Sequence, residues 1–172
     1  MTIIPDEINQ LNVVSFTTNF SILPNVDFFC QRVNIPAVNL GVYRQPTPLS
    51  DAPTEGDKID FEQFAMNFIV NEDLSNYLEI YNWLIAMGFP DDHNQFNLAK
   101  NLNQTGTKTI RSDMNIIINT NKSNPNYSVT FKDAFPISLG SIELDASATS
   151  LEPIIVDATF EFVGSFSIEK IT

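Results

Sequence analysis

The segment from Phe64 to Val70 constrains the fold of this chain most, because it is the clearest part of an alternating strand that begins near Ile59. Side chains on a β-strand alternate between two faces. The alternation therefore predicts one apolar face and one face of small or polar residues. The apolar face holds Phe64, Met66, Phe68 and Val70, and the opposite face holds Gln63, Ala65 and Asn67.

A helix is predicted directly after this strand, over about residues 73–87. Asn71-Glu72-Asp73 provides a cap and negative charge for the positive end of the helix dipole. Gly88 is placed to end the helix in a left-handed cap, and Pro90 prevents its continuation. Helical spacing predicts one stripe facing the core, made of Leu74, Tyr77, Leu78, Tyr81, Leu84 and Ile85.

The N-terminal part predicts a β-hairpin. Residues 14–23 alternate, with Phe16, Thr18 and Phe20 on one face. Pro24-Asn25 is typical of a tight turn, and residues 27–35 are expected to return as the second strand.

The C-terminal half predicts further strands over residues 109–120, 127–131, 136–144 and 154–168, with a turn at 146–150. In the last strand Val156, Ala158, Phe160 and Phe162 point inward, and Gly164 is expected to form a bulge. Residues 91–108 are polar and rich in Asn, with a short helical turn expected at 96–102. The whole pattern predicts one domain, residues 1–172, that is mainly antiparallel β with one principal α-helix.

Residues 36–58 show no sustained period, and the part from Val38 to Lys58 contains three prolines and two glycines. Loops of this length inside a domain are usually functional or disordered. Isolated apolar residues such as Val42 and Tyr43 favour a loop that docks on another surface. A mobile surface loop stays open as the alternative.

Charge excludes one class of function. The chain has 21 acidic and 9 basic residues, a formal net charge of −12. Non-specific binding to nucleic acid depends on Lys and Arg at phosphates, so tight gripping of DNA or RNA is not expected. An acidic surface could let a polyanion pass without sticking, or could serve solubility alone.

Groups for catalysis or metal binding are few. Cys30 is the only cysteine, and the only histidine, His93, follows Asp91-Asp92 in a turn whose adjacent side chains rarely converge on one metal ion. The acidic residues Asp51, Glu55 and Asp57 lack calcium-loop spacing, and no serine lies in a G-x-S-x-G elbow. We predict no catalytic residue, no metal, no cofactor and no enzyme. No signal peptide or membrane-spanning run is apparent either.

Three passages resemble the tail tube proteins of contractile-tailed bacteriophages and the inner-tube proteins of related injection systems. They are SFTTNFSILPNVDFFCQRVNIPAVNLG, FAMNFIVNEDLSNYLEIYNWLIAMG and FPISLGSIELDASATSLEPIIVDATFEFVGSFSIEK. Their counterparts in the family are an N-terminal hairpin, a strand-to-helix junction with an acidic start, and a terminal strand pair. The Asn-rich segment 91–126 matches this pattern least.

The resemblance implies a β-sandwich or partial barrel that closes into a barrel on hexamerisation. It implies a virion structural protein, made in the host cytoplasm, whose hexameric rings stack into a tube for DNA ejection. Four strands of each subunit would line the lumen. The implied partners are further copies of the chain, the tail sheath protein, and baseplate and tail-terminator proteins. Tape-measure protein and DNA would pass through without tight binding, and no membrane is involved.

Two sets of site residues follow from these expectations. Polar residues opposite the Phe-rich faces are expected to face the lumen: Thr17, Asn19, Ser21, Gln63, Asn67, Asp157, Thr159 and Glu161. The long loop is expected to bridge neighbouring rings through Val42, Tyr43, Arg44 and Leu49.

Two alternatives stay open. One is a baseplate, neck or tail-terminator component built on the same domain, which would form a single ring. The other is a soluble β-sandwich binding module, for example for carbohydrate, whose signature would be aromatic residues on loops. Trp83 and most Phe residues fall in regular elements instead, which disfavours it.

Overall fold

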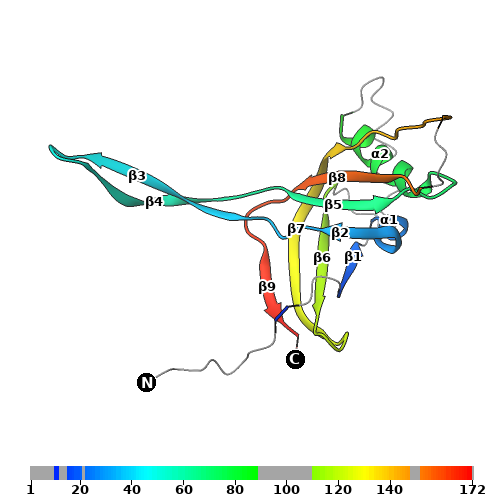
Figure 1. The fold of residues 1–172 in the computed structure, drawn as a ribbon, viewed down its shortest axis with the longest axis horizontal. Helices are drawn as coiled ribbons and strands as arrows, with labels where there is room; N and C mark the ends of the chain where they lie inside the picture. Colours follow the sequence, from blue (N-terminus) through cyan, green and yellow to red (C-terminus); the bar gives the residue numbers. More distant parts are fainter. Residues whose placement is uncertain (1–9, 12–14, 21, 89–109, 148–151, 172) are drawn as a thin grey trace.

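The fold consists of two antiparallel sheets that share one long strand and of a separate two-stranded ribbon, in a computed structural model that describes residues 10–11, 15–20, 22–88, 110–147 and 152–171 (Figure 1). The elements of the described residues are β1 (Phe16–Phe20), α1 (Pro24–Phe29), β2 (Cys30–Val33), β3 (Val38–Pro46), β4 (Asp51–Phe61), β5 (Phe64–Ile69), α2 (Ser75–Gly88), β6 (Ser112–Asn119), β7 (Pro125–Leu139), β8 (Ile155–Glu161) and β9 (Ser167–Lys170). The prediction of a mainly antiparallel β-protein is confirmed.

Strand β7 belongs to both sheets because it bends at Asp133. Its first half pairs with β6 and β9, and its second half pairs with β8. Asp133 has φ of 50°, and its backbone N–H donates to Asp113 Oδ1 at 3.0 Å. We call β1, β6, β9 and the first half of β7 sheet I. Sheet II contains the second half of β7 with β8, β5 and β2.

The core fills the angle between the inner faces of these two sheets. Phe64 stands at its centre, with ring centroids 4.9 Å from Phe131 and 5.9 Å from Phe160. Trp83 of α2 packs on Phe160 at 6.2 Å, and its indole Nε1 donates to the carbonyl of Ile110 at 2.6 Å. Burying each such ring contributes roughly 1.5–3 kcal/mol, so this cluster carries much of the subunit's stability.

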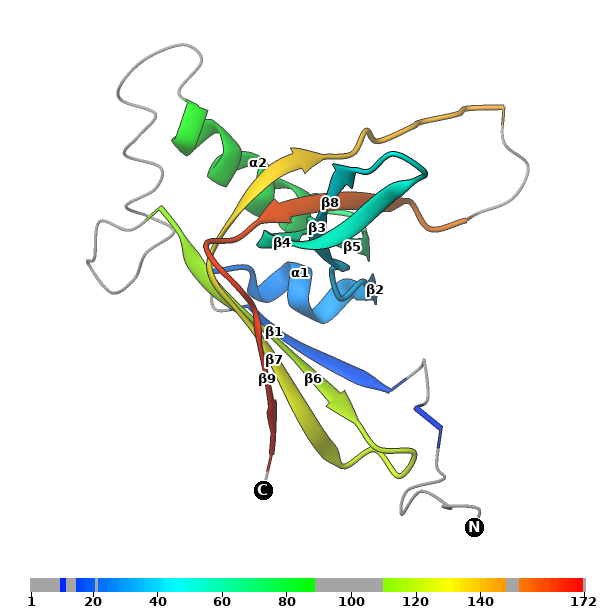
Figure 2. The same cartoon turned by 90° about the vertical axis from the view of Figure 1, so that its left-hand side faces the viewer.

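Helix α1 lies between the two sheets (Figure 2). It occupies the place of the predicted turn at Pro24-Asn25, so the predicted N-terminal hairpin is wrong. Strand β1 pairs with β6, and β2 pairs with β5, so the two predicted arms never meet. Pro24 starts a helix here because its fixed φ suits the first helical turn. Leu23, the residue before the helix, and Val26, within it, are both fully buried and attach α1 to the core.

Helix α2 corresponds to the predicted helix at about 73–87, but the predicted core stripe is wrong. The fully buried side chains are Asn76, Ile80, Trp83 and Ala86, whereas Leu74, Leu78 and Tyr81 are exposed. Tyr77 and Leu84 are only partly buried against the core. Because apolar residues surround most of this helix, periodicity alone could not select the buried face.

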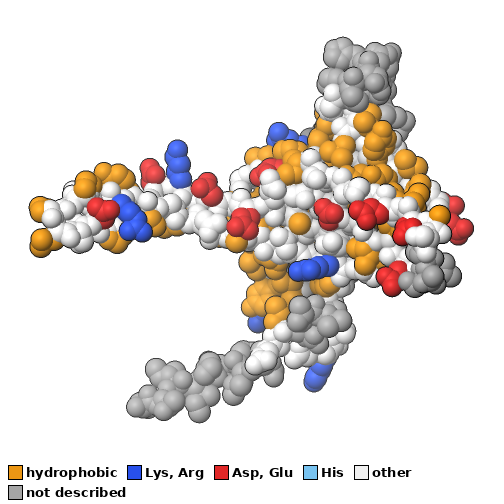
Figure 3. All heavy atoms as spheres, turned by 45° about the horizontal axis from the view of Figure 1, so that its top comes forward, with side chains coloured by type: hydrophobic (Ala, Val, Ile, Leu, Met, Phe, Trp, Pro, Cys, Tyr) orange, Lys and Arg blue, Asp and Glu red, His pale blue; other side chains and the backbone are white. Residues whose placement is uncertain are grey.

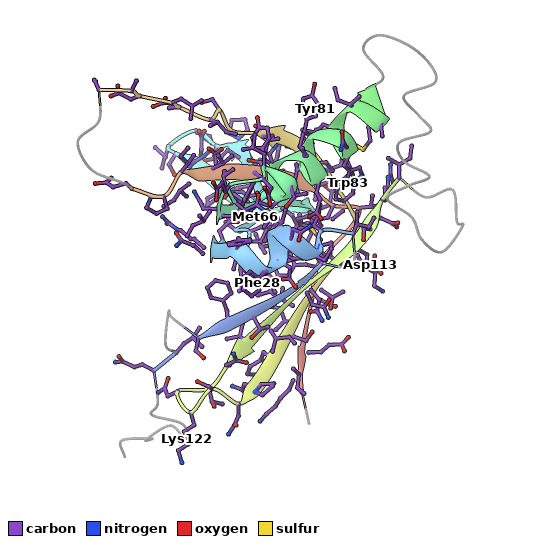
Figure 4. All side chains as sticks on the ribbon, turned by 90° about the vertical axis from the view of Figure 1, so that its right-hand side faces the viewer. Phe28, Met66, Tyr81, Trp83, Asp113 and Lys122 are labelled. Carbon is purple, nitrogen blue, oxygen red and sulfur yellow. The ribbon has the colours of Figure 1, made fainter. Side chains whose placement is uncertain are left out.

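Asn76 decides how α2 is turned. Its Nδ2 donates to the carbonyl of Ile69 at 2.7 Å, and its Oδ1 accepts from the N–H of Tyr77 at 2.9 Å. Figure 4 shows Trp83 directed into the molecule and Tyr81 directed away from it. A buried amide satisfied in this way ties the end of β5 to the start of α2.

Three predicted boundaries also change. The strand predicted from Ile59 to Val70 is interrupted after Phe61, so its beginning belongs to β4 and its end is β5. The predicted final strand is interrupted at Gly164, which lies between β8 and β9 and has a φ of 78°. Gly88 ends α2 without a left-handed conformation. The turn predicted near residue 96, Pro90 and His93 lie outside the described residues.

The segment predicted as an irregular loop at 36–58 is instead a two-stranded ribbon. Strands β3 and β4 pair with each other from Val38 opposite Phe61 to Pro46 opposite Asp51. A shift in register between Leu40 and Val42 changes the phase along β3, which hides the alternation in the sequence. Figure 1 shows this ribbon projecting far from the two sheets.

Two glycines allow the ribbon strands to approach closely at that shift. A Cβ on Gly56 would overlap the carbonyl oxygen of Gly41 and lie 2.7 Å from its carbonyl carbon. Because both partners are backbone atoms, no side chain could move aside. Gly56 is therefore required by the ribbon and by nothing else in the described fold.

Burial along α2 predicts a contrast between two aliphatic residues. Ile80 is 0% exposed and Leu78 is 44% exposed. We expect Ile80→Ala to lower the free energy of unfolding by about 2–5 kcal/mol, and Leu78→Ala by less than about 1 kcal/mol. Urea unfolding of the unassembled subunit measures both. Equal losses would contradict the orientation of α2.

The glycine contact predicts a local effect of Gly56→Ala. Backbone amides of residues 38–61 should exchange with solvent faster, while amides of β5 and β8 keep their protection. Gly88→Ala is the matched control, because a Cβ there meets no atom within 4 Å. Hydrogen exchange by mass spectrometry resolves the two regions, and unchanged ribbon protection in Gly56→Ala would refute the close approach.

Candidate assembly surfaces

The β3–β4 ribbon carries apolar side chains that nothing else in the described structure covers. Val42, Tyr43 and Arg44 lie on β3, and Leu49, in the turn, is 99% exposed. Val38, Leu40 and Ile59 are also exposed nearer the two sheets. Figure 3 shows hydrophobic side chains at the end of the ribbon, with acidic and basic groups along it.

A ribbon of this kind is unusual on an isolated subunit. Two strands alone are marginally stable in water, and exposed apolar patches mark surfaces for association. All four residues predicted to contact a neighbour lie on this ribbon. Its exposed apolar groups make it the first candidate assembly surface.

The outer face of sheet II brings together part of the predicted lumen set. Asn67 of β5 and Asp157 of β8 are directly opposed, and Thr159 and Glu161 follow Asp157 at two-residue spacing. All four lie opposite the buried residues of their strands. The face therefore combines two carboxylates with small polar groups and with one cation, Arg32 of β2, which is directly opposed to Asn67.

The other predicted lumen residues lie elsewhere. Thr17 and Asn19 are exposed on β1, which belongs to sheet I. Gln63 lies in the interruption between β4 and β5, and Ser21 lies outside the described residues. The sequence could not separate these groups because alternation gives a phase within one strand and no pairing between strands.

Two neighbours of Asp157 on sheet II were not predicted. Ser138 is paired with Thr159, and the N–H of Gly140 donates to the carbonyl of Asp157 at 2.7 Å. A Cβ on Gly140 would lie 2.5 Å from Asp157 Oδ1, so the carboxylate rests against bare backbone. The sequence pattern could not predict this arrangement, because the register shift between Pro136 and Ser138 interrupts the regular alternation of β7.

The outer face of sheet I is also polar, with a different chemistry. Asn115 of β6 accepts hydrogen bonds at Oδ1 from Ser128 at 2.7 Å and from Thr130 at 3.4 Å. Asn19 is the partner of Asn115 across β1 and β6. Asn115 thus satisfies the hydroxyl groups of Ser128 and Thr130, whereas the outer face of sheet II carries charged groups, Arg32 of β2 and the two carboxylates of β8.

Several strands have one edge without a partner in the described part of the chain. Strand β1 pairs only with β6, β2 only with β5, and the second half of β7 ends sheet II opposite β2. Unpaired edges of this kind favour pairing with another chain unless they are protected. Phe28 stands near the β1 and β2 edges with 82% of its side chain exposed, lining an open hollow of about 470 Å³ (Figure 4).

Three titratable groups near α1 have a raised pKa. Burial raises the pKa of Asp27 and of Glu79, and the Asn25 side chain, which donates to Glu79 Oε1 at 2.5 Å, opposes the rise at Glu79. Burial raises the pKa of Cys30 to about 11, so the thiol is protonated at neutral pH and is a weak nucleophile.

The described residues contain no cluster of three His, Cys, Asp or Glu side chains suited to a metal ion. Within the same residues no helix has the length and apolar character needed to cross a membrane.

Chains with a similar fold occur in contractile injection systems. One belongs to the tube-terminating cap of the anti-feeding prophage, with a TM-score of 0.62 and 15% identity over 99% of this chain and 100% of that chain. Another belongs to the anti-feeding prophage baseplate, with a TM-score of 0.60 and 13% identity over 98% and 97%. A third, from the sheath–tube complex of an extracellular contractile injection system, has a TM-score of 0.58 and 12% identity over 95% and 94%.

At these identities the similarity concerns the fold alone. No curated protein sequence matches the chain. The model of one family, described as phage tail tube protein, matches residues 2–163. Because this match spans nearly the whole sequence, the chain belongs to the phage tail tube protein family.

Proposed function

We propose that this chain is the tube subunit of a contractile tail, forming hexameric rings that stack into the conduit for DNA ejection. Membership of the tail tube family makes it a tail structural protein. The single observation that carries the finer proposal is the exposed β3–β4 ribbon, which extends from the subunit and leaves apolar groups without cover. The role is architectural and needs no catalytic group.

Ring closure is supported by the two free edges of sheet II. Pairing β2 of one copy with the second half of β7 in the next would continue the sheet from subunit to subunit. Each copy would then contribute four strands to one closed barrel. Closure removes the unpaired edges, which are otherwise sites of uncontrolled association.

The outer face of sheet II is the proposed lumen surface. Its inner face is covered by the core, α1 and α2, so its outer face is the one left for water. Asp157 and Glu161 would repel phosphates, Asn67 and Thr159 are uncharged, and Arg32 of β2 adds one positive charge opposite Asn67. With sheet II around the lumen, Thr17 and Asn19 would face away from the DNA.

Stacking would be carried by the ribbon, through Val42, Tyr43, Arg44 and Leu49. The proposed surroundings follow from this role: sheath protein outside the tube, baseplate and terminator proteins at its ends, and tape-measure protein and DNA inside. The protein would be made in the host cytoplasm and would reside in the virion tail.

A terminator or baseplate subunit is the second candidate. The similar chains from the anti-feeding prophage cap and baseplate support it, because this fold serves there too. Such a subunit would form one ring and would not polymerise. The soluble binding module has no support comparable to the family match.

Negative-stain microscopy with light scattering tests the proposal directly on the purified protein. We expect hexameric rings that stack into tubes of uniform diameter as concentration rises. Single rings that never stack would favour the terminator or baseplate role. Monomers at every concentration and salt, with and without baseplate and sheath proteins, would contradict both.

The lumen surface predicts an effect of charge reversal. Asp157→Lys with Glu161→Lys should leave tubes intact but slow DNA release, most strongly at low salt where phosphate contacts are least screened. Glu72→Lys with Glu143→Lys is the matched control, because both residues are exposed outside the strands of sheet II. Release is followed by dye fluorescence on complemented phage. Equal release rates for both double variants would show that sheet II does not line the lumen.

A further inference from the structure

A second candidate contact surface lies at the far end of sheet I, beyond the core. Its apolar side chains are Leu11, Ile118, Tyr127 and Ile168, and they surround a hollow of about 860 Å³ that is open to solvent. We call it the distal hollow. Ile118 and Tyr127 are directly opposed across β6 and β7, and Ile168 is opposed to the buried Val129.

The distal hollow therefore continues the inner, apolar face of sheet I past the point where the core ends. Figure 2 shows this part of the sheet extending below α1 and sheet II. Ile168 is 56% exposed and Leu11 is 67% exposed. The apolar side chains are thus ordered by the sheet and left without cover by any other described element.

The charge around the distal hollow is the reverse of the charge of the whole chain. Lys122 and Lys170 line it, and none of its described lining residues is acidic. Only 9 of the chain's residues are basic, against 21 acidic ones. Figure 4 places Lys122 at the turn between β6 and β7, at the rim of this end of the sheet.

The β3–β4 ribbon has the complementary composition. It holds four acidic residues, Asp51, Glu55, Asp57 and Asp60, against the two basic residues Arg44 and Lys58. Val42, Tyr43 and Leu49 provide exposed apolar groups that can cover the apolar side chains of the hollow. A nine-residue strand spans about 30 Å, so the ribbon reaches well beyond its own subunit.

We propose that the ribbon of one copy docks in the distal hollow of a second copy in the adjacent ring. This inference rests on the proposed function, since it names the receptor for the stacking ribbon. Apolar side chains of the ribbon would cover Ile118, Tyr127 and Ile168. Asp51 and Glu55 would lie toward Lys122 and Lys170. This charge pairing would fix the direction and register of the docked ribbon more than it would increase the affinity.

The test uses charge reversal and its compensation. Lys122→Glu with Lys170→Glu should leave rings intact and abolish stacking, because Asp51 and Glu55 of the ribbon would then meet two further carboxylates. Adding Asp51→Lys and Glu55→Lys to the same chain should restore tubes. Lys132→Glu is the control, because Lys132 is exposed on β7 away from the hollow. Tube formation is measured by negative-stain microscopy and sedimentation.

A cross-link gives a measurement that does not depend on charge. Leu49→Cys with Ile168→Cys, in a Cys30→Ser background, should form an intermolecular ladder on oxidation of assembled tubes, and neither single cysteine should do so. Tubes of normal length from the Lys122 and Lys170 variant, absence of compensation, or absence of the ladder would each overturn the docking. A wild-type chain that yields no rings or tubes would instead overturn the proposed function.

Discussion

The hydrogen bond from the Asp133 N–H to Asp113 Oδ1 supports the feature on which the rest of the subunit depends, the bend of β7. A straight β7 would place all its partners in one sheet, and the inner faces of β6 and β8 could not approach each other. With the bend, Phe131 from one half meets Phe64 and, through it, Phe160 from the other sheet. The positive φ at Asp133 costs free energy, and the Asp113 carboxylate offsets part of that cost.

The core that results does not use all the apolar residues of the chain. Leu78 and Tyr81 face outward on α2, Ile168 and Leu11 surround the distal hollow, and the ribbon carries its own exposed set. In a monomer these groups would be a liability for aggregation. In the proposed tube each of these groups could be covered by a neighbouring subunit, so burial of the apolar surface would be completed by assembly.

Sequence patterns predicted the features that depend only on residues close together in the chain. Alternation identified the inward residues of β5 and β8 correctly, because each strand has one buried and one open face. The same reasoning failed where pairing decided the outcome. Nothing near Pro24-Asn25 reveals that β1 pairs with β6, about a hundred residues away, and so the turn was preferred to α1.

The same limit applies to the candidate surfaces: alternation predicted the face within a strand, but not the sheet to which the strand belongs. Asp157, Thr159 and Glu161 lie on one face because they share one strand, and Asn67 lies on the same face through its pairing with Asp157. Thr17 and Asn19 lie in sheet I instead, because the alternation within a strand does not determine which sheet the strand enters. On α2, Asn76 belongs to the buried face because its amide donates to the carbonyl of Ile69, which apolar periodicity cannot predict.

The self-contained pairing of β3 with β4 separates the length of the ribbon from the stability of the core. Two residues added to each arm would extend it by about 7 Å without changing any contact of the two sheets. In the proposed assembly, ring diameter would depend on sheet II, whereas the axial distance between rings would depend on the ribbon. Changes in ribbon length could then alter the rise between rings and leave the bore unchanged.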